Sequence, residues 1–188
     1  MPPPLAMGIG AMRRVMIVGA PGSGKSTLAR HLGKRTSLPV HHMDHIHHLP
    51  DWVQRPRDER IAMAHAVEAG EAWIFEGGLS ATYDNRAARA DTIIWLDLPV
   101  GLRLFRVIRR LFRHYGQTRP DMAEGCTETV GWHTVEFIHW IITTRQPQRR
   151  RIMKVIDDFG AGRRVIHLQS RRAVAAYLAS VDDGGVKA

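Results

Sequence analysis

Short apolar segments alternate with amphipathic segments along most of the chain. The apolar segments have the length of buried strands and lie at 13–19, 38–43, 72–75, 92–96 and 164–168. Apolar side chains at helical spacing follow them at 28–32, 57–69, 102–112, 128–145 and 172–179. No hairpin signal separates the strands, so each strand returns by a crossover and the sheet must be parallel. The pattern predicts an α/β fold, a three-layer αβα sandwich with a five-stranded parallel sheet.

A chain of 188 residues with 44% hydrophobic residues suits one domain with its own core. We expect that domain at 13–180, after a disordered proline- and glycine-rich lead-in at 1–12 and before a frayed tail at 181–188. No apolar run approaches about 18 residues, so no membrane span is expected. The single cysteine, Cys126, cannot form an internal disulfide, which favours a reducing, cytoplasmic location.

The positive charge of the chain is concentrated in one region. The net charge is +9, and residues 101–172 carry fourteen arginines and one lysine against six acidic residues, which leaves the rest neutral. Arginine presents a planar fork that binds phosphate or carboxylate through two hydrogen bonds. The region is typical of an anion-binding surface, of a solvated basic face, or of a nucleic-acid contact.

A glycine-rich segment between the first predicted strand and the first predicted helix matches the P-loop pattern, Gly-x4-Gly-Lys-Ser. In such a loop, backbone N–H groups and the helix N-terminus surround a phosphate. Lys25 is then placed to reach the β- and γ-phosphates of a nucleotide, and the Ser26 hydroxyl to ligate Mg²⁺. No Asn-Lys-x-Asp segment for guanine is present, so we expect ATP and Mg²⁺ as cofactors. The expected nucleotide-binding residues are Gly19, Ala20, Pro21, Gly22, Ser23, Gly24, Lys25, Ser26 and Thr27.

Further segments extend the P-loop into a longer resemblance. They are Asp44 after the second strand, Trp73 to Gly78, Arg86, Ala90 to Pro99, and Arg106 to Arg110. With these, the chain resembles the P-loop kinases of the adenylate kinase and shikimate kinase type from about Val15 to Leu178. It looks most similar to the bacterial DNA topology modulation proteins, which are related to adenylate kinase. The resemblance implies transfer of a phosphoryl group from ATP to a small acceptor, and a mobile lid.

The resemblance also suggests a carboxylate for the metal. Similar kinases carry Asp-Gly after the third strand, where this chain has Glu76 followed by Gly77. Glutamate is one methylene longer and still suits a Mg²⁺-bound water. A rival carboxylate, Asp97, follows four apolar residues at the end of the fourth strand. We favour Glu76 as the metal-side residue, together with Ser26.

Arginines of the basic region are candidates for binding the transferring phosphoryl group. Arg106 and Arg110 are four residues apart and lie on one face of the predicted helix. The resemblance implies that these two reach the nucleotide phosphates, and that Arg145 or Arg149 joins them from the helix after the lid. An arginine aimed at the charge that develops in phosphoryl transfer can accelerate the reaction about 10³- to 10⁵-fold. We expect the lid at 114–126, a polar loop without helical periodicity.

The acceptor site is expected beside Asp44, which follows the second strand. Asp44 would orient or deprotonate an acceptor hydroxyl, or else cap the next turn. Arg86 would hold an anionic acceptor, or else form a surface ion pair. Around Asp44 stand five histidines, which favour a polar lining of the acceptor pocket over a metal site: His41, His42, His45, His47 and His48. Trp52 would stack on a planar acceptor or cover the core.

Two functions follow from these residues. The first is an ATP-dependent kinase acting on a small, anionic or nucleotide-like acceptor. The alternative is an ATP-binding protein associated with nucleic acid, in which 101–172 contacts the phosphate backbone. The alternative lacks interleaved aromatic residues for stacking on bases, apart from Phe112 and Tyr115.

Overall fold

A five-stranded parallel sheet forms the centre of the computed structural model, which describes residues 12–118 and 122–182. The strand order is β2-β3-β1-β4-β5, and every paired neighbour is parallel. The strands are β1 (Arg14–Gly19), β2 (Val40–His42), β3 (Trp73–Glu76), β4 (Thr92–Leu96) and β5 (Arg164–Leu168). This arrangement confirms the predicted α/β fold and parallel sheet.

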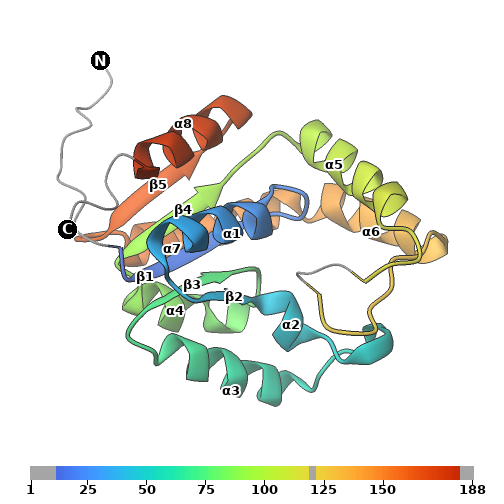
Figure 1. Ribbon diagram of the computed structural model, residues 1–188, viewed down its shortest axis with the longest axis horizontal. Helices are drawn as coiled ribbons and strands as arrows, with labels where there is room; N and C mark the ends of the chain where they lie inside the picture. The colour runs from blue at the N-terminus through green and yellow to red at the C-terminus, as the bar shows by residue number, and fades with distance from the viewer. Residues whose placement is uncertain (1–11, 119–121, 183–188) are drawn as a thin grey trace.

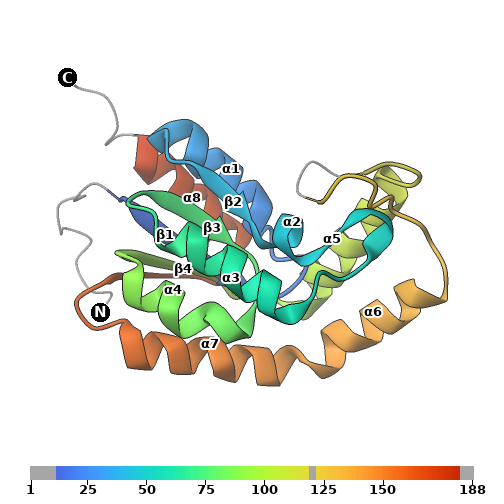
Figure 2. The same cartoon turned by 90° about the horizontal axis from the view of Figure 1, so that it is seen from below.

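Helices connect the strands and cover both faces of the sheet, as Figure 1 shows. They are α1 (Lys25–Thr36), α2 (Met43–His47), α3 (Arg57–Glu68), α4 (Tyr83–Arg89), α5 (Val100–Arg113), α6 (Trp132–Thr143), α7 (Arg145–Phe159) and α8 (Arg171–Asp182). Two short 3₁₀ turns, Pro50–Trp52 and Ser80–Thr82, precede α3 and α4. In Figure 2, α1 and α8 lie on one side of the strands, with α3, α4 and α7 on the other.

Alternating side chains of each strand supply the two apolar layers. In β1, Val15 and Ile17 pack with the buried face of α1 and with α8, whereas Met16 and Val18 pack with α3, α4 and α7. A strand buried on both faces is apolar throughout, which is why these segments lack polar alternation. A third, smaller cluster joins α5 to α6 beyond the end of the sheet.

Several element boundaries differ from the predicted ones, and the following three have a clear physical reason or consequence. The segment after β2 is the short helix α2, because Met43 and Ile46 are buried one helical turn apart. Helix α7 begins before Pro147, which the first turn of a helix tolerates because its N–H groups need no intrahelical partner. Helix α8 continues to Asp182, so the tail predicted at 181–188 is wrong for its first two residues. The remaining tail residues, 183–188, and the lead-in at 1–11 lie outside the described residues.

Candidate active site

The P-loop lies where the sequence predicts it, between the end of β1 and the start of α1. Gly22 and Gly24 have φ angles of 75° and 95°, in the left-handed region that glycine adopts without strain. A Cβ atom at Gly22 would overlap the backbone carbonyl of Arg103 in α5, so glycine is required there for packing as well. Gly24 precedes α1 and has no side chain, so among the residues that the structure describes no hydrogen bond from a side chain caps this helix N-terminus. The backbone N–H groups at this end are therefore available to an anion.

Two side chains of the P-loop segment, those of Lys25 and Ser23, have contacts that bear on phosphate binding. Lys25 Nζ donates a hydrogen bond to the Ala20 carbonyl at 3.4 Å, which keeps the ammonium above the loop. The Ser23 hydroxyl is buried and has no hydrogen-bond partner among residues 12–118 and 122–182. An unpartnered hydroxyl inside a cradle of amides fits a loop built to surround phosphate oxygens.

Arg106 lies against this loop. Its Nη1 donates to the Ser23 carbonyl at 3.0 Å, so α5 is fastened to the P-loop through a guanidinium. Burial lowers the pKa of Arg106, and the nearby charge of Arg171 lowers it further. Arg171 is the first residue of α8, a position that the sequence analysis did not select. The charge of Arg171 in α8 thus acts on the Arg106 guanidinium that lies beside the loop.

Glu76 is the last residue of β3, which lies next to β1 in the sheet, and it is only 2% exposed. His42 of β2 pairs with it in register, and their Nδ1 and Oε1 atoms are 2.7 Å apart. The imidazole therefore holds one carboxylate oxygen in place. The carboxylate of Glu76 and the hydroxyl of Ser26 are hard oxygen donors of the kind that suits Mg²⁺.

Asp97, the rival metal-side residue, is engaged elsewhere. Its Oδ2 accepts from Arg149 Nε at 3.2 Å and lies 3.1 Å from His167 Nε2. The His167 ring stacks on Trp95 with centroids 4.0 Å apart, and the Arg149 guanidinium lies over the same indole. This cluster holds α7 to β4 and β5, which supports Glu76 over Asp97 as the metal-side candidate.

The histidines around Asp44 divide among different partners. His41 meets the edge of Phe75, His47 contacts Arg60, and His48 meets the edge of Trp52. Among residues 12–118 and 122–182, no three His, Cys, Asp or Glu side chains form a group that could hold a metal ion. Asp44 lies in the first turn of α2, directly after β2, while no side chain caps that helix. A role of Asp44 toward an acceptor stays a prediction.

The interpretation of Arg86 as an acceptor-binding residue is corrected by the structure. Arg86 is completely buried, and its Nε donates to Glu68 Oε1 at 3.1 Å. Its other two nitrogens donate to the Gly77 carbonyl and to Thr82 Oγ1, each at 3.0 Å. The guanidinium carbon also lies 3.9 Å from the centre of the Phe75 ring. Arg86 therefore joins α3, α4 and the end of β3, and an acceptor in solution cannot reach it.

Arg110 also has a partner within the protein. Its Nε lies 3.8 Å from Oε1 of Glu128, a buried residue between the expected lid and α6. The pair connects the end of α5 to the chain that leads into α6. Contact between Arg110 and nucleotide phosphates stays a prediction.

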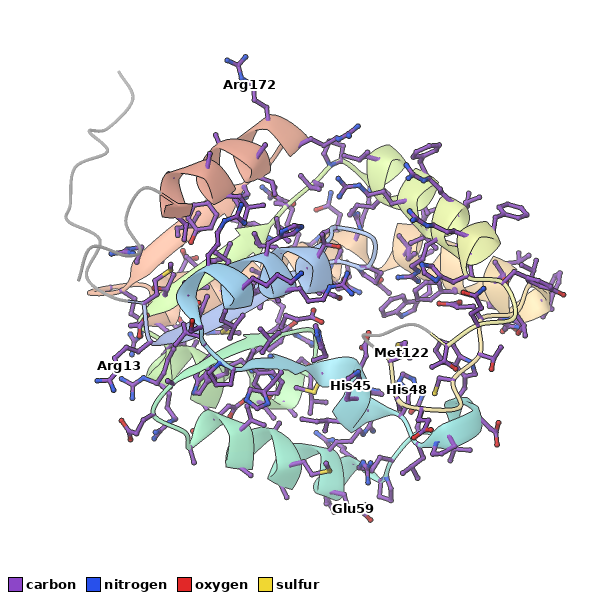
Figure 3. The ribbon with its side chains drawn as sticks, viewed as in Figure 1. Arg13, His45, His48, Glu59, Met122 and Arg172 are labelled. Carbon is purple, nitrogen blue, oxygen red and sulfur yellow. The ribbon has the colours of Figure 1, made fainter. Side chains whose placement is uncertain are left out.

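The expected lid at 114–126 is described except for 119–121. The segment 122–128, which includes the end of this lid and which we call the docked segment, contacts the turn between α2 and α3. Cys126 Sγ donates to the Leu49 carbonyl at 3.3 Å, and Trp52 Nε1 donates to the Thr127 carbonyl at 2.8 Å. Figure 3 shows Met122 on the same side of the molecule as His45 and His48. The segment that follows α5 is thereby fixed to the chain that connects α2 with α3.

Arg145 and Arg149 line a cleft of about 500 Å³ together with Ala20 of the P-loop. Arg103 of α5 lines the same cleft, and the sequence analysis missed it. The sequence shows that Arg103 lies three residues before Arg106. It does not show that Arg103 is buried by packing against the P-loop, because no residue pattern indicates that contact. His42 was missed as a partner of Glu76 for the same reason, because strand register is set by the fold.

Many arginines of the basic region have partners inside the protein. The guanidinium of Arg163, for example, donates hydrogen bonds to the carbonyls of Ala88, Ala90 and Phe159. Others point into solvent, such as Arg172, which Figure 3 shows directed away from the molecule. Among the helices of the described chain, none is long and apolar enough to cross a membrane.

Comparison with known proteins finds a relative by sequence. No protein-family model matches the chain. The uncharacterized protein YqaC of Bacillus subtilis is 31% identical over 108 residues, which are 55% of this chain. The match spans 60% of the length of that relative.

Solved structures reveal a wider likeness. Shikimate kinase from Acinetobacter baumannii, solved in complex with shikimate, aligns with a TM-score of 0.55 and 17% identity over 92% of each chain. Shikimate kinase from Bacteroides thetaiotaomicron aligns with a TM-score of 0.52 and 19% identity, over 92% of this chain and 98% of that one. The chain therefore has the P-loop kinase fold that is found in shikimate kinases.

Proposed function

We propose that this protein is an ATP-dependent kinase that transfers the γ-phosphoryl group to a small, anionic or nucleotide-like acceptor. The observation that carries the proposal is the P-loop between β1 and α1, with Lys25 folded over it and Arg106 hydrogen-bonded to its Ser23 carbonyl. A polyanion bound there meets backbone N–H groups, an ammonium and a guanidinium together. The shared fold with shikimate kinases supports the same reaction class.

In the proposed reaction, an acceptor hydroxyl attacks the γ-phosphorus and the bond to the β-phosphate oxygen breaks, which releases ADP. Asp44 orients that hydroxyl and takes up its proton. Lys25 and Arg106 bind the phosphate oxygens on which negative charge develops. Arg110 is a further candidate for this role, whereas Arg145, which the resemblance also implies, lines the cleft between α5 and α7. The docked segment excludes water, which would otherwise compete with the acceptor for the phosphoryl group.

Magnesium is the metal that suits this site. Ser26 in the first turn of α1 and Glu76 at the end of β3 would hold it, Glu76 through a bound water, and His42 fixes the orientation of Glu76. When bound, Mg²⁺ neutralises phosphate charge and orients the transferred group.

The nucleic-acid alternative is not favoured by the contacts of the basic region. Arg103, Arg106, Arg110, Arg149 and Arg163 all interact with groups of the protein itself. A surface that binds a phosphate backbone needs such side chains free to reach outward. The closer likeness to DNA topology modulation proteins stays a prediction that rests on the residue pattern alone.

Acceptor-dependent ADP release tests the kinase proposal. The protein is incubated with Mg-ATP and separate pools of nucleoside monophosphates, phosphorylated sugars and hydroxy acids, and ADP is measured by a coupled assay. We expect one pool to stimulate ADP release, and Lys25→Ala to abolish the stimulation. Lys34→Ala, at an exposed lysine in the last turn of α1, is the matched control and should retain it. Stimulation by no pool, or an active Lys25→Ala variant, would contradict the proposal.

A further inference from the structure

The cleft between α5 and α7 has a charged lining that the proposed kinase reaction does not require in full. It lies at the ends of β4 and β5 and has a volume of about 500 Å³, within the range of small-molecule sites. Its polar lining includes Asp97, Arg103, Arg145, Gln148, Arg149 and Gln169. Ala20 is the single P-loop residue that borders it. Figure 2 shows that α7 covers the face of the sheet opposite to α1.

Arg103 is the residue that distinguishes this cleft from an ordinary surface hollow. Arg103 is only 5% exposed, and its Nε donates a hydrogen bond to the Leu98 carbonyl at 3.1 Å. Nη1 is buried and has no hydrogen-bond partner among residues 12–118 and 122–182. A buried guanidinium with an unused donor is unfavourable unless an anion or another acceptor completes its hydrogen bonds. Burial accordingly lowers the pKa of Arg103.

Among the described residues, the carboxylate that attracts Arg103 is shared with other positive groups. Asp97 attracts Arg103 electrostatically, but its Oδ2 is already shared by Arg149 and His167. The positive charge of Arg145 repels that of Arg103 and lowers the pKa of Arg103 further. Arg103, Arg145 and Arg149 therefore line the cleft together with one carboxylate, Asp97. That balance favours a ligand with more than one negative charge.

The remaining residues of the cleft offer a ligand both polar and apolar contacts. The side-chain amides of Gln148 and Gln169 can donate or accept hydrogen bonds, and Ile152 and Trp95 provide apolar contacts. Planar guanidinium groups bind phosphate oxygens through paired hydrogen bonds.

We propose that this cleft is a second anion site, separate from the P-loop, which binds the phosphoryl group of a small phosphorylated molecule through Arg103, Arg145 and Arg149. The site rests on the cleft and its charges, and it stands whether or not the protein is a kinase. Arg103 and Arg106 lie three residues apart on α5 and therefore on one face, so the same side of this helix borders both the P-loop and the cleft.

Calorimetric titration at low ionic strength tests the proposal, with inorganic pyrophosphate and glycerol 3-phosphate as probes. In the Lys25→Ala variant, where the P-loop is impaired, we expect one equivalent of probe to bind. Arg103→Gln in the same background should weaken that binding at least tenfold. Arg113→Gln, which removes one exposed charge from the same helix, is the matched control and should bind as its parent does.

The outcomes separate this site from the P-loop. Equal affinities of the Arg103→Gln and Arg113→Gln variants would overturn the proposal, and so would loss of all binding in Lys25→Ala alone. If Arg103→Gln does not fold, Arg145→Gln, at an exposed position, takes its place in the titration. We expect this variant to bind the probe at least threefold more weakly, and unchanged binding would overturn the proposal. Binding at the cleft without acceptor-dependent ADP release would refute the kinase function and leave this site standing.

Discussion

Replacing Arg86 by methionine removes a completely buried guanidinium while keeping most of the side-chain volume. Arg86 is hydrogen-bonded to Glu68, to the Gly77 carbonyl and to Thr82, so the variant leaves a buried carboxylate without its main counter-charge. Breaking a buried ion pair on one side destabilises a protein by about 3–5 kcal/mol. For a chain of this size, that loss lowers the melting temperature by about 6–20 °C.

The free energy of unfolding is measured by urea denaturation followed through tryptophan fluorescence, at one pH and salt concentration. Arg150→Met, at an exposed arginine of α7, is the matched control and should change stability by less than about 0.5 kcal/mol. The double variant Glu68→Met, Arg86→Met removes both charges together. It should recover at least half of the loss, because a buried pair replaced by apolar groups is often nearly neutral.

One result would refute the reasoning. If Arg86→Met unfolds at the same urea concentration as the parent but no longer saturates with acceptor, Arg86 belongs to the acceptor site and the buried pair is not structural. A destabilised variant whose acceptor affinity is unchanged supports the structural role.

Three further predictions concern the site and its surroundings. Arg106→Ala should lower the rate of phosphoryl transfer about 10²- to 10³-fold in the ADP-release assay, because it removes a charge beside the transferring group; a rate within threefold of the parent would contradict this. Gly77→Ala should destabilise the protein by about 2–4 kcal/mol in urea denaturation, because φ at Gly77 is 106° and the added Cβ would lie 2.6 Å from Met43 Cβ. Gly101→Ala is the control and should have little effect, because the space around Gly101 is open. Burial lowers the pKa of His47 from 6.5 to about 4, with further contributions from Arg60 and His48. The unfolded chain therefore binds the proton at higher pH than the folded one, and stability falls as pH drops from about 6.5 towards 4, by about 1 kcal/mol after allowance for solvent screening; in His47→Gln the free energy of unfolding should fall less over the same range.

The parts of the site that sequence reasoning predicts are those formed by neighbouring residues. The P-loop is local, because its glycines, Lys25 and Ser26 lie within one turn and the start of one helix. The alternation of apolar and amphipathic segments likewise implies the parallel sheet, since connections of that length allow little else. Both depend on spacing along the chain, which the sequence displays directly.

The remaining features depend on contacts between distant segments. Arg86 was misassigned because its partner, Glu68, lies on the preceding helix and its burial follows from how α4 packs on β3. The pairing of His42 with Glu76 depends on the register of β2 against β3. The burial of Arg103 depends on the approach of α5 to the P-loop. None of these distances can be obtained from residue spacing, because each joins elements that only the folded sheet brings together.

The contact between Cys126 and the Leu49 carbonyl gives the molecule a natural reporter of opening. Cys126 is the sole thiol of the chain, it is fully buried, and it lies in the docked segment. A maleimide can therefore alkylate the protein only while that segment has lifted from the turn between α2 and α3. The alkylation rate measures how often this happens, without an introduced label, and ligands that hold the segment down should slow the modification in proportion to their occupancy.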